Sequence, residues 1–129
     1  MPIEKQLSIF VQNKTGILAD LCKNFSAANI NIKSFSIVDD LDWGILRIIV
    51  DDTDASKKIL NARGLTYGES HVLSVETRNH PGALAALAEK LAENEINIEQ
   101  AFATAAGNKS LIVMSTTDDQ KANIVLSHD

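Results

Sequence analysis

The sequence predicts an α+β protein built from two tandem βαββαβ repeats, of which the second lacks its last strand. Three observations predict this fold class. The sequence matches itself at an offset of 66 residues, which takes Asn13 onto Asn79. The same order of alternating and helical apolar patterns occurs twice, and no Gly- or Pro-rich linker separates the copies. We predict one repeat at residues 1–70 and a C-terminally shortened repeat at residues 71–129.

The offset brings identical residues together at several separate points. The tripeptide Ile30-Asn31-Ile32 falls on Ile96-Asn97-Ile98, and Gly16 falls on Gly82. An identical tripeptide and a shared N-x-x-G motif at one offset are poorly explained by chance. Further matched pairs are Leu7-Ser8 with Leu73-Ser74, Leu18 with Leu84, Leu21 with Leu87, Asp52 with Asp118 and Leu60 with Leu126.

The elements of the first repeat follow from the periodicity of its apolar residues. Leu7, Ile9 and Val11 alternate with polar residues, which predicts a strand, whereas Leu18, Leu21 and Phe25 have helical spacing. Gly64 is suited to end the second helix. The predicted elements are strand 5–12, helix 16–28, strand 30–38, a turn at 39–42, strand 44–50, helix 53–63 and strand 66–72.

The second repeat is predicted to follow the same order as far as the sequence extends. Its elements are strand 71–78, helix 82–94, strands 96–105 and 109–116, and a short helix 118–126. A fourth strand is expected near 132–138, beyond Asp129. The right-handed crossover rule places both helices of each repeat on one face of its sheet.

The absent strand leaves one edge of residues 71–78 without a partner. Either the fourth strand of the first repeat serves both units, or a second subunit pairs with this edge. Because a continuous strand through 66–78 cannot lie beside itself, we expect the second solution and therefore a homodimer.

The composition excludes several classes of protein. Hydrophobic residues make up 45 % of the 129 residues and charged residues 22 %, as in globular domains. The net charge of −5, with scattered Lys and Arg, argues against nucleic-acid binding. No apolar run is long enough to span a membrane, and Met1–Lys5 does not resemble a signal peptide. The lone Cys22 excludes an intrachain disulfide, so we expect a cytoplasmic protein.

Two strand-to-helix turns are the strongest candidates for a binding site. An Asn side chain can cap backbone donors, and Gly allows another molecule to approach the backbone. A helix start also offers unpaired N–H groups and a positive dipole end, which suit a carboxylate. The alternative is that N-x-x-G is only turn chemistry. The candidate residues are Asn13, Lys14, Thr15, Gly16, Ile17 and Leu18, and Asn79, His80, Pro81, Gly82, Ala83 and Leu84.

Asn31 and Asn97 form a second pair of candidates. Each is predicted early in a strand, between two isoleucines, with its side chain opposite to theirs. Asn is disfavoured in strands, so it is either an exposed edge residue or an amide available to a ligand.

The run R-N-H-P-G-A-L-A-A-L-A from Arg78, followed by I-N-I, resembles the ACT domain, a regulatory module of amino-acid biosynthetic enzymes. The resemblance is closest to the serine-sensing ACT domain of phosphoglycerate dehydrogenase. It implies a ferredoxin-like sheet and an effector held where two ACT units meet side by side. The ligand loop maps onto 13–16 and 79–82, and the strand-two amide onto Asn31 and Asn97. Val11 and Thr77 stand where the serine-binding relative has a His, which disfavours serine.

The resemblance implies a regulatory protein that binds a free amino acid. Apart from Lys14 and His80, neither turn carries a charged residue that could pair with a charged ligand side chain. We therefore expect the ligand to have a small apolar or branched side chain. A non-catalytic dimerisation or adaptor module without a ligand is the alternative. No nucleophile, acid–base pair or phosphate loop indicates an enzyme, and no cofactor is expected. His71, His80 and His128 lack ligand spacing, and the acidic residues Asp39, Asp40, Asp42, Asp51 and Asp52 are expected in loops and caps rather than at a metal.

Overall fold

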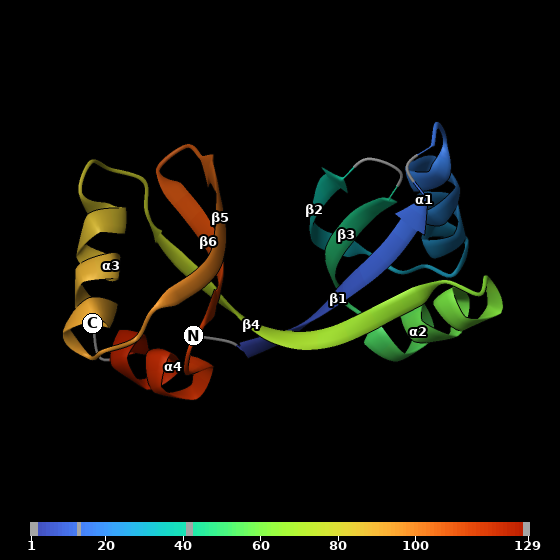
Figure 1. Cartoon of the computed structure of the whole chain (residues 1–129). Helices are drawn as coiled ribbons and strands as arrows, with labels where there is room; N and C mark the ends of the chain where they lie inside the picture. Colours follow the sequence, from blue (N-terminus) through green and yellow to red (C-terminus); the bar gives the residue numbers. More distant parts are fainter. Residues whose placement is uncertain (1–2, 13, 41–42, 128–129) are drawn as a thin grey trace. The chain divides into compact units, whose positions relative to one another are not determined.

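The structure, a computed structural model, describes residues 3–12, 14–40 and 43–127 (Figure 1). Its described residues divide into two compact units. Residues 5–70 form the first unit, and residues 3–4 with 71–127 belong to the second. Both units show the predicted order of elements, and the second has no strand after its last helix among the described residues.

The first unit contains a complete βαββαβ repeat. Its strands follow the order β2-β3-β1-β4, and β3 is antiparallel to both β1 and β2. This is the arrangement expected of a ferredoxin-like sheet. The elements are β1 (Ile3–Gln12), α1 (Ile17–Ala27), β2 (Ile32–Asp40), β3 (Trp43–Val50), α2 (Thr53–Ala62) and β4 (Thr66–Arg78), of which β1 and β4 also contribute residues to the second unit.

The core of the first unit lies between its sheet and its two helices. Alternate residues of β1 are almost fully buried, as the sequence pattern predicts. Leu21 and Phe25 from α1 and Leu60 from α2 pack into the same apolar cluster. Both helices therefore cover one face of this sheet, as the crossover rule predicts.

The second unit repeats this packing with fewer strands. Its strand order is β4-β6-β5, and β6 is antiparallel to both neighbours. Leu87 and Leu91 from one helix and Leu126 from the other pack against the strands. The elements after β4 are α3 (Ala83–Glu93), β5 (Ile98–Ala106), β6 (Lys109–Thr116) and α4 (Asp119–Ser127).

The predicted strands 66–72 and 71–78 form one continuous strand, β4, as the absence of a linker between them indicates. The sequence predicts that a second subunit covers the outer edge of 71–78, whereas β1 neighbours β4 in the strand order and Ile3 packs against the second core. The start of β1 therefore occupies part of this edge.

The helix ends follow the predicted local chemistry. Gly64, with φ 67°, follows α2 and confirms its predicted role after the helix. Asn29 and Glu95 have φ 59° after α1 and α3, so these two helices end in the same left-handed conformation. Asp52 caps α2 by accepting a hydrogen bond from the Ala55 N–H at 3.0 Å.

In the described ranges, no helix has the length and apolar character needed to cross a bilayer.

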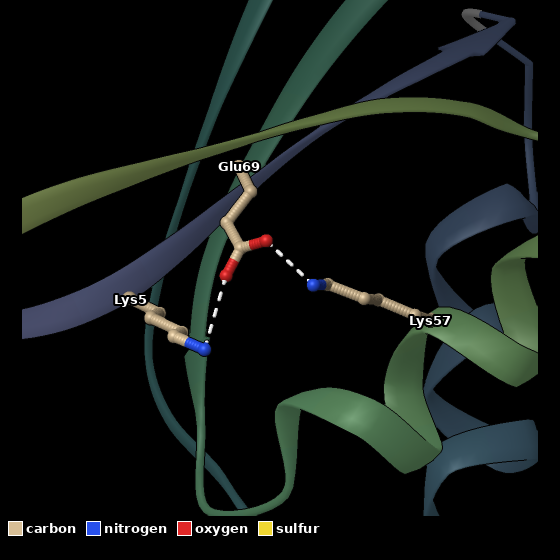
Figure 2. A network of polar contacts seen from close by, with 3 residues as sticks. All are labelled: Lys5, Lys57 and Glu69. Atoms are coloured by element: carbon tan, nitrogen blue, oxygen red, sulfur yellow. Dashed lines mark hydrogen bonds and ion pairs between the residues drawn. The ribbon is translucent and has the colours of Figure 1, made fainter.

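An ion-pair network joins three elements of the first unit (Figure 2). The Lys57 ammonium lies 2.5 Å from one Glu69 oxygen, and the Lys5 ammonium lies 3.5 Å from the other. The hydrogen bond from Lys57 lowers the pKa of Glu69, and the same bond raises the pKa of Lys57. The network therefore links β1, α2 and β4. It is present only while the Glu69 carboxylate and the two lysine ammonium groups are charged.

We expect Glu69→Gln to cause a small fall in Tm at neutral pH. A lowered carboxylate pKa contributes stability above the unfolded-state value of about 4.3, and that contribution is lost as the pH falls through the folded-state pKa. The difference in Tm between Glu69→Gln and the original protein should therefore shrink below about pH 4 and in high salt. Glu99→Gln, at an exposed position of β5, is the control. A difference that persists in acid would contradict this assignment.

Candidate functional site

The two strand-to-helix turns have the same backbone conformation. Gly16 precedes α1 with φ 89° and ψ −7°, and Gly82 precedes α3 with φ 90° and ψ −11°. A Cβ added at either glycine would meet no atom within 4 Å. The left-handed φ, rather than crowding, is therefore what requires glycine at these positions.

The hydrogen bonds of the turns are also duplicated. In the first turn, the Lys14 N–H donates to the Gln12 carbonyl at 3.0 Å and the Asp20 N–H to the Gly16 carbonyl at 3.0 Å. In the second, the His80 N–H donates to the Arg78 carbonyl at 3.2 Å and the Ala86 N–H to the Gly82 carbonyl at 2.9 Å. The two turns are thus two copies of one structure.

Backbone donors remain available where α1 and α3 begin. Neither helix receives a side-chain cap from a residue that the structure describes. Among the described residues, the N–H groups of Leu18, Ala19, Leu84 and Ala85 make no hydrogen bond. Unpaired donors at a positive dipole end are the chemistry that a carboxylate would use.

The predicted capping role of the turn asparagine is wrong for Asn79. Its Nδ2 group donates to the Gly107 carbonyl at 3.0 Å, and its backbone N–H donates to the Asn108 carbonyl at 2.8 Å. Asn79 therefore fastens the turn to the β5–β6 hairpin. Asn13, its counterpart, lies outside the described residues.

The remaining turn residues are accessible to a ligand to different degrees. Ile17, Leu18 and Ala83 are half-buried, and Leu84 is exposed. His80 is exposed, and its Nδ1 atom lies 2.9 Å from the Pro81 carbonyl, to which it can only donate. The exposed predicted residues of the two turns also include Lys14, Thr15, Gly16, Pro81 and Gly82.

Asn31 and Asn97 occupy equivalent positions just before β2 and β5, not within these strands as predicted. The Asn31 N–H donates to the Asp51 carboxylate at 3.0 Å, and the Asn97 N–H donates to the Thr117 hydroxyl at 3.1 Å. Both residues are exposed, and neither side-chain amide has a hydrogen-bond partner among the described residues. Each amide is therefore available to another molecule.

Within one unit, the structure places the turn and the strand-two amide at opposite ends. Gln12 at the end of β1 pairs with Trp43, whereas Ile32 at the start of β2 pairs with Val50 at the far end of β3. The intervening helix α1 has 11 residues, which corresponds to about 16 Å. A ligand at the first turn therefore cannot reach Asn31 of the same unit.

Three hollows lie near these residues. An apolar cavity of about 180 Å³ lies between α1 and β2, lined by Leu18, Cys22 and Phe35 among others. A more polar hollow of about 460 Å³ at the end of α1 includes Asn31 and Asp51. In the second unit, a groove of about 630 Å³ includes His80 and Ala83.

Several residues that line these hollows were not among the site residues predicted from the sequence. Arg78 and Thr77 line the groove of the second unit beside the predicted His80. Phe35 and Cys22 line the apolar cavity of the first unit. Arg78 could have been noticed in the sequence, because it stands next to the second turn at the position where the first repeat has Gln12.

Asp52 serves as a helix cap, as expected, but Asp39 and Asp40 belong to the end of β2, paired with Gly44 and Trp43, and not to the predicted turn 39–42. Asp51 and Asp52 bind backbone N–H groups, and Asp118 accepts from the Lys121 N–H at 3.0 Å as the counterpart of Asp52. No cluster of three metal-ligating side chains occurs in the part of the chain that the structure describes. Asp42 and His128 lie outside that part.

Two units of the βαββ type, each with the same glycine turn between its first strand and first helix, define a tandem α+β protein with two copies of one candidate site. The chain belongs to the ACT domain pair family, whose sequence profile matches residues 1–129. This confirms the family resemblance and the tandem fold class. No curated protein matches the sequence.

Two solved structures have a fold similar to that of this chain, at different levels of sequence identity. Protein BT0572 from Bacteroides thetaiotaomicron is 32 % identical with a TM-score of 0.92, over 98 % of this chain and 88 % of that one. The regulatory subunit of aspartate kinase from Thermus thermophilus, in a ligand-free form, is 12 % identical with a TM-score of 0.73, over 98 % and 94 %. The second likeness concerns the fold alone.

Proposed function

We propose that this protein is a non-catalytic, cytoplasmic regulatory protein that binds a free amino acid at the strand-to-helix turns. The single observation that carries the proposal is the duplicated glycine turn with free N–H groups at the start of α1 and α3. The ligand carboxylate would bind these N–H groups beside Gly16 or Gly82. Membership of the ACT family supports regulatory small-molecule binding.

The ligand side chain is proposed to be small and apolar or branched. Leu18 belongs to the first turn and also lines the apolar cavity between α1 and β2. A cavity of about 150 Å³ with an apolar lining is large enough for benzene, and this one measures about 180 Å³. A carboxylate at the turn would therefore lie beside a space suited to an apolar side chain.

The amide of Asn31 or Asn97 would be contributed by a different unit from the turn. The two features lie at opposite ends of each unit, so a site that uses both requires two units to meet. This requirement supports a ligand held between ACT units and a homodimer. A ligand-free dimerisation or adaptor module is a second candidate, favoured by the exposed Phe35 and Ile37 on β2.

The site is tested by adding a carboxylate where the ligand carboxylate should bind. Thr15 and Pro81 are equivalent exposed positions directly before Gly16 and Gly82. An acid at a helix start favours the helix but repels a second anion. We expect Thr15→Asp and Pro81→Asp to weaken amino-acid binding about tenfold or more, which is about 1.4 kcal/mol, relative to Thr15→Asn and Pro81→Asn.

The measurement is a thermal-shift screen with the common amino acids, followed by calorimetry of the variants. A ligand at 100 times its Kd should stabilise the protein by about 2.7 kcal/mol. Equal affinities for the Asp and Asn variants would exclude the turns as the carboxylate site. If no amino acid raises Tm, the proposed function is wrong and the adaptor function is favoured.

A further inference from the structure

The sheet of the first unit has an open face, the face opposite α1 and α2, and this face carries exposed apolar side chains. Alternate residues of β1 enter the core, so Phe10 lies on the open face. Phe10 is paired with Ile45 of β3, and Ile45 is paired with Val38 of β2. Trp43, two residues before Ile45, shares this face. Phe10, Val38 and Trp43 are 41 %, 48 % and 55 % exposed.

The second unit shows how close the positions of Phe10 and Trp43 are to each other. At the 66-residue offset they correspond to Glu76 and Lys109. Strands β4 and β6 pair in the same register as β1 and β3, and the Glu76 carboxylate lies 3.2 Å from the Lys109 ammonium. Side chains at these two positions can therefore contact the same small molecule. The first unit has two exposed aromatic rings where the second has an ion pair, and exposed rings are suited to stacking on a third ring.

Arg47 adds a positive charge to the open face. It is half-buried and lies between Ser8 of β1 and Ser36 of β2 in the paired strands. Among the described residues, Arg47 has no ion-pair partner, and the Ser8 and Ser36 hydroxyls make no hydrogen bond. A guanidinium between two free hydroxyls offers hydrogen-bond donors to an oxyanion. The equivalent position of the second unit is Val113, so this charge belongs to the first unit.

The size and the charge of the open face favour a small ligand over a protein. Trp43 and Arg47 are four residues apart on β3, which corresponds to about 13 Å. Ile49, the next residue on this side of β3, is only 3 % exposed, so the accessible strip ends there. A stable protein interface needs about 800 Å² on each partner. A second copy that used the same face would also bring two Arg47 side chains together without a counter-charge.

We propose that the open face of the first unit binds a small aromatic oxyanion. The ring would lie against Phe10 and Trp43, and the oxyanion would bind Arg47 and the two flanking hydroxyls. The distance along the strip matches one ring with one attached anionic group. This site uses neither a glycine turn nor the start of a helix, so it does not depend on the proposed function.

The test uses phenyl phosphate as the probe and the fluorescence of Trp43, the single tryptophan, as the reporter. We expect phenyl phosphate to change the Trp43 emission and to bind at least about tenfold more tightly than inorganic phosphate or phenol. Arg47→Gln should weaken phenyl phosphate binding at least about tenfold and leave phenol binding unchanged. Phe10→Leu keeps an apolar side chain but removes the ring, so it should weaken both aromatic probes about fivefold.

Two matched substitutions control for general effects on the first unit. Arg63→Gln removes the same charge at the exposed end of α2. Phe35→Leu removes a ring from the opposite side of the sheet, where Phe35 lines the cavity beside α1. Both variants should bind phenyl phosphate like the original protein.

The outcomes separate this proposal from the proposed function. If the Trp43 emission does not respond, or phenol binds as tightly as phenyl phosphate, the proposal is wrong and amino-acid binding at the turns is unaffected. If Thr15→Asp and Pro81→Asp abolish probe binding while Arg47→Gln retains it, the probe occupies the turns and the open face is excluded. If Phe10→Leu or Arg47→Gln converts a dimer to a monomer in light scattering, a second copy covers this face and the proposal is wrong. Probe binding that depends on Arg47 and Phe10 supports the open face even if no amino acid binds.

Discussion

Replacing Phe25 with alanine is expected to lower the free energy of unfolding by about 3–5 kcal/mol. Phe25 lies on α1, is only 1 % exposed and belongs to the core cluster of the first unit. The substitution removes a ring from a closely packed site and leaves a cavity that neighbouring side chains fill only in part. Because domains are typically stable by 5–15 kcal/mol, this is a large fraction of the total.

Phe35→Ala is the matched control for this substitution. Phe35 is 56 % exposed on β2, so the same truncation removes little buried surface within the unit. Urea unfolding should be followed by the fluorescence of Trp43, the single tryptophan, which lies at the start of β3 in the first unit. Equal losses for Phe25→Ala and Phe35→Ala would contradict the assigned burial.

The order of elements was predictable because each depends on local periodicity. The alternation in β1 and the helical spacing of Leu18, Leu21 and Phe25 report which face is buried, whatever the partner. The helix ends were also predictable where one residue type fixes the backbone, as at Gly64. The boundaries of β2 and β5 were less certain, because Asn31 and Asn97 continue the pattern without joining the strands.

The site was harder to predict because it depends on contacts between distant segments. The hydrogen bond from Asn79 to Gly107 joins residues 28 positions apart, and no local pattern indicates it. The separation of Gly16 from Asn31 follows from strand register rather than from sequence distance. The state of Arg78 was also not predictable from the sequence. Its neighbour Glu76 is paired with Lys109, so the Arg78 guanidinium has no acidic partner among the described residues.

Apolar residues on an edge strand are a particular source of error. Phe35 and Ile37 have the alternation of buried strand residues, yet they are 56 % and 49 % exposed. The reason is that β2 lies at the end of the strand order, where β3 is its neighbour on one edge and the described residues supply no strand on the other. The sequence pattern marks a face that is suited to burial but does not say which molecule buries it.

We expect the protein to be a homodimer in which the exposed edge of β2 is covered by a second copy. Phe35, Ile37 and Val38 lie together on this strand with 48 to 56 % exposure. An exposed apolar edge strand is a template for pairing with another chain. In the second unit the corresponding edge strand β5 carries Ala101 and Ala103 at the equivalent positions, so the large apolar side chains belong to the first unit.

Replacing Phe35 and Ile37 together with glutamate is expected to convert the dimer to a monomer. Two charges at a paired apolar edge should weaken association by about a hundredfold or more, since truncating a single central interface residue can cost about 2 kcal/mol. Light scattering at micromolar concentration should give twice the chain mass of 14.0 kDa for the original protein and one chain mass for the double variant. Ala101→Glu with Ala103→Glu, the same charges on β5, should leave the dimer intact. Two results would exclude β2 as the dimer edge: a monomeric original protein, or a dimer that both pairs of substitutions break equally. The cavity between α1 and β2 would then be open to solvent rather than adjacent to a second copy.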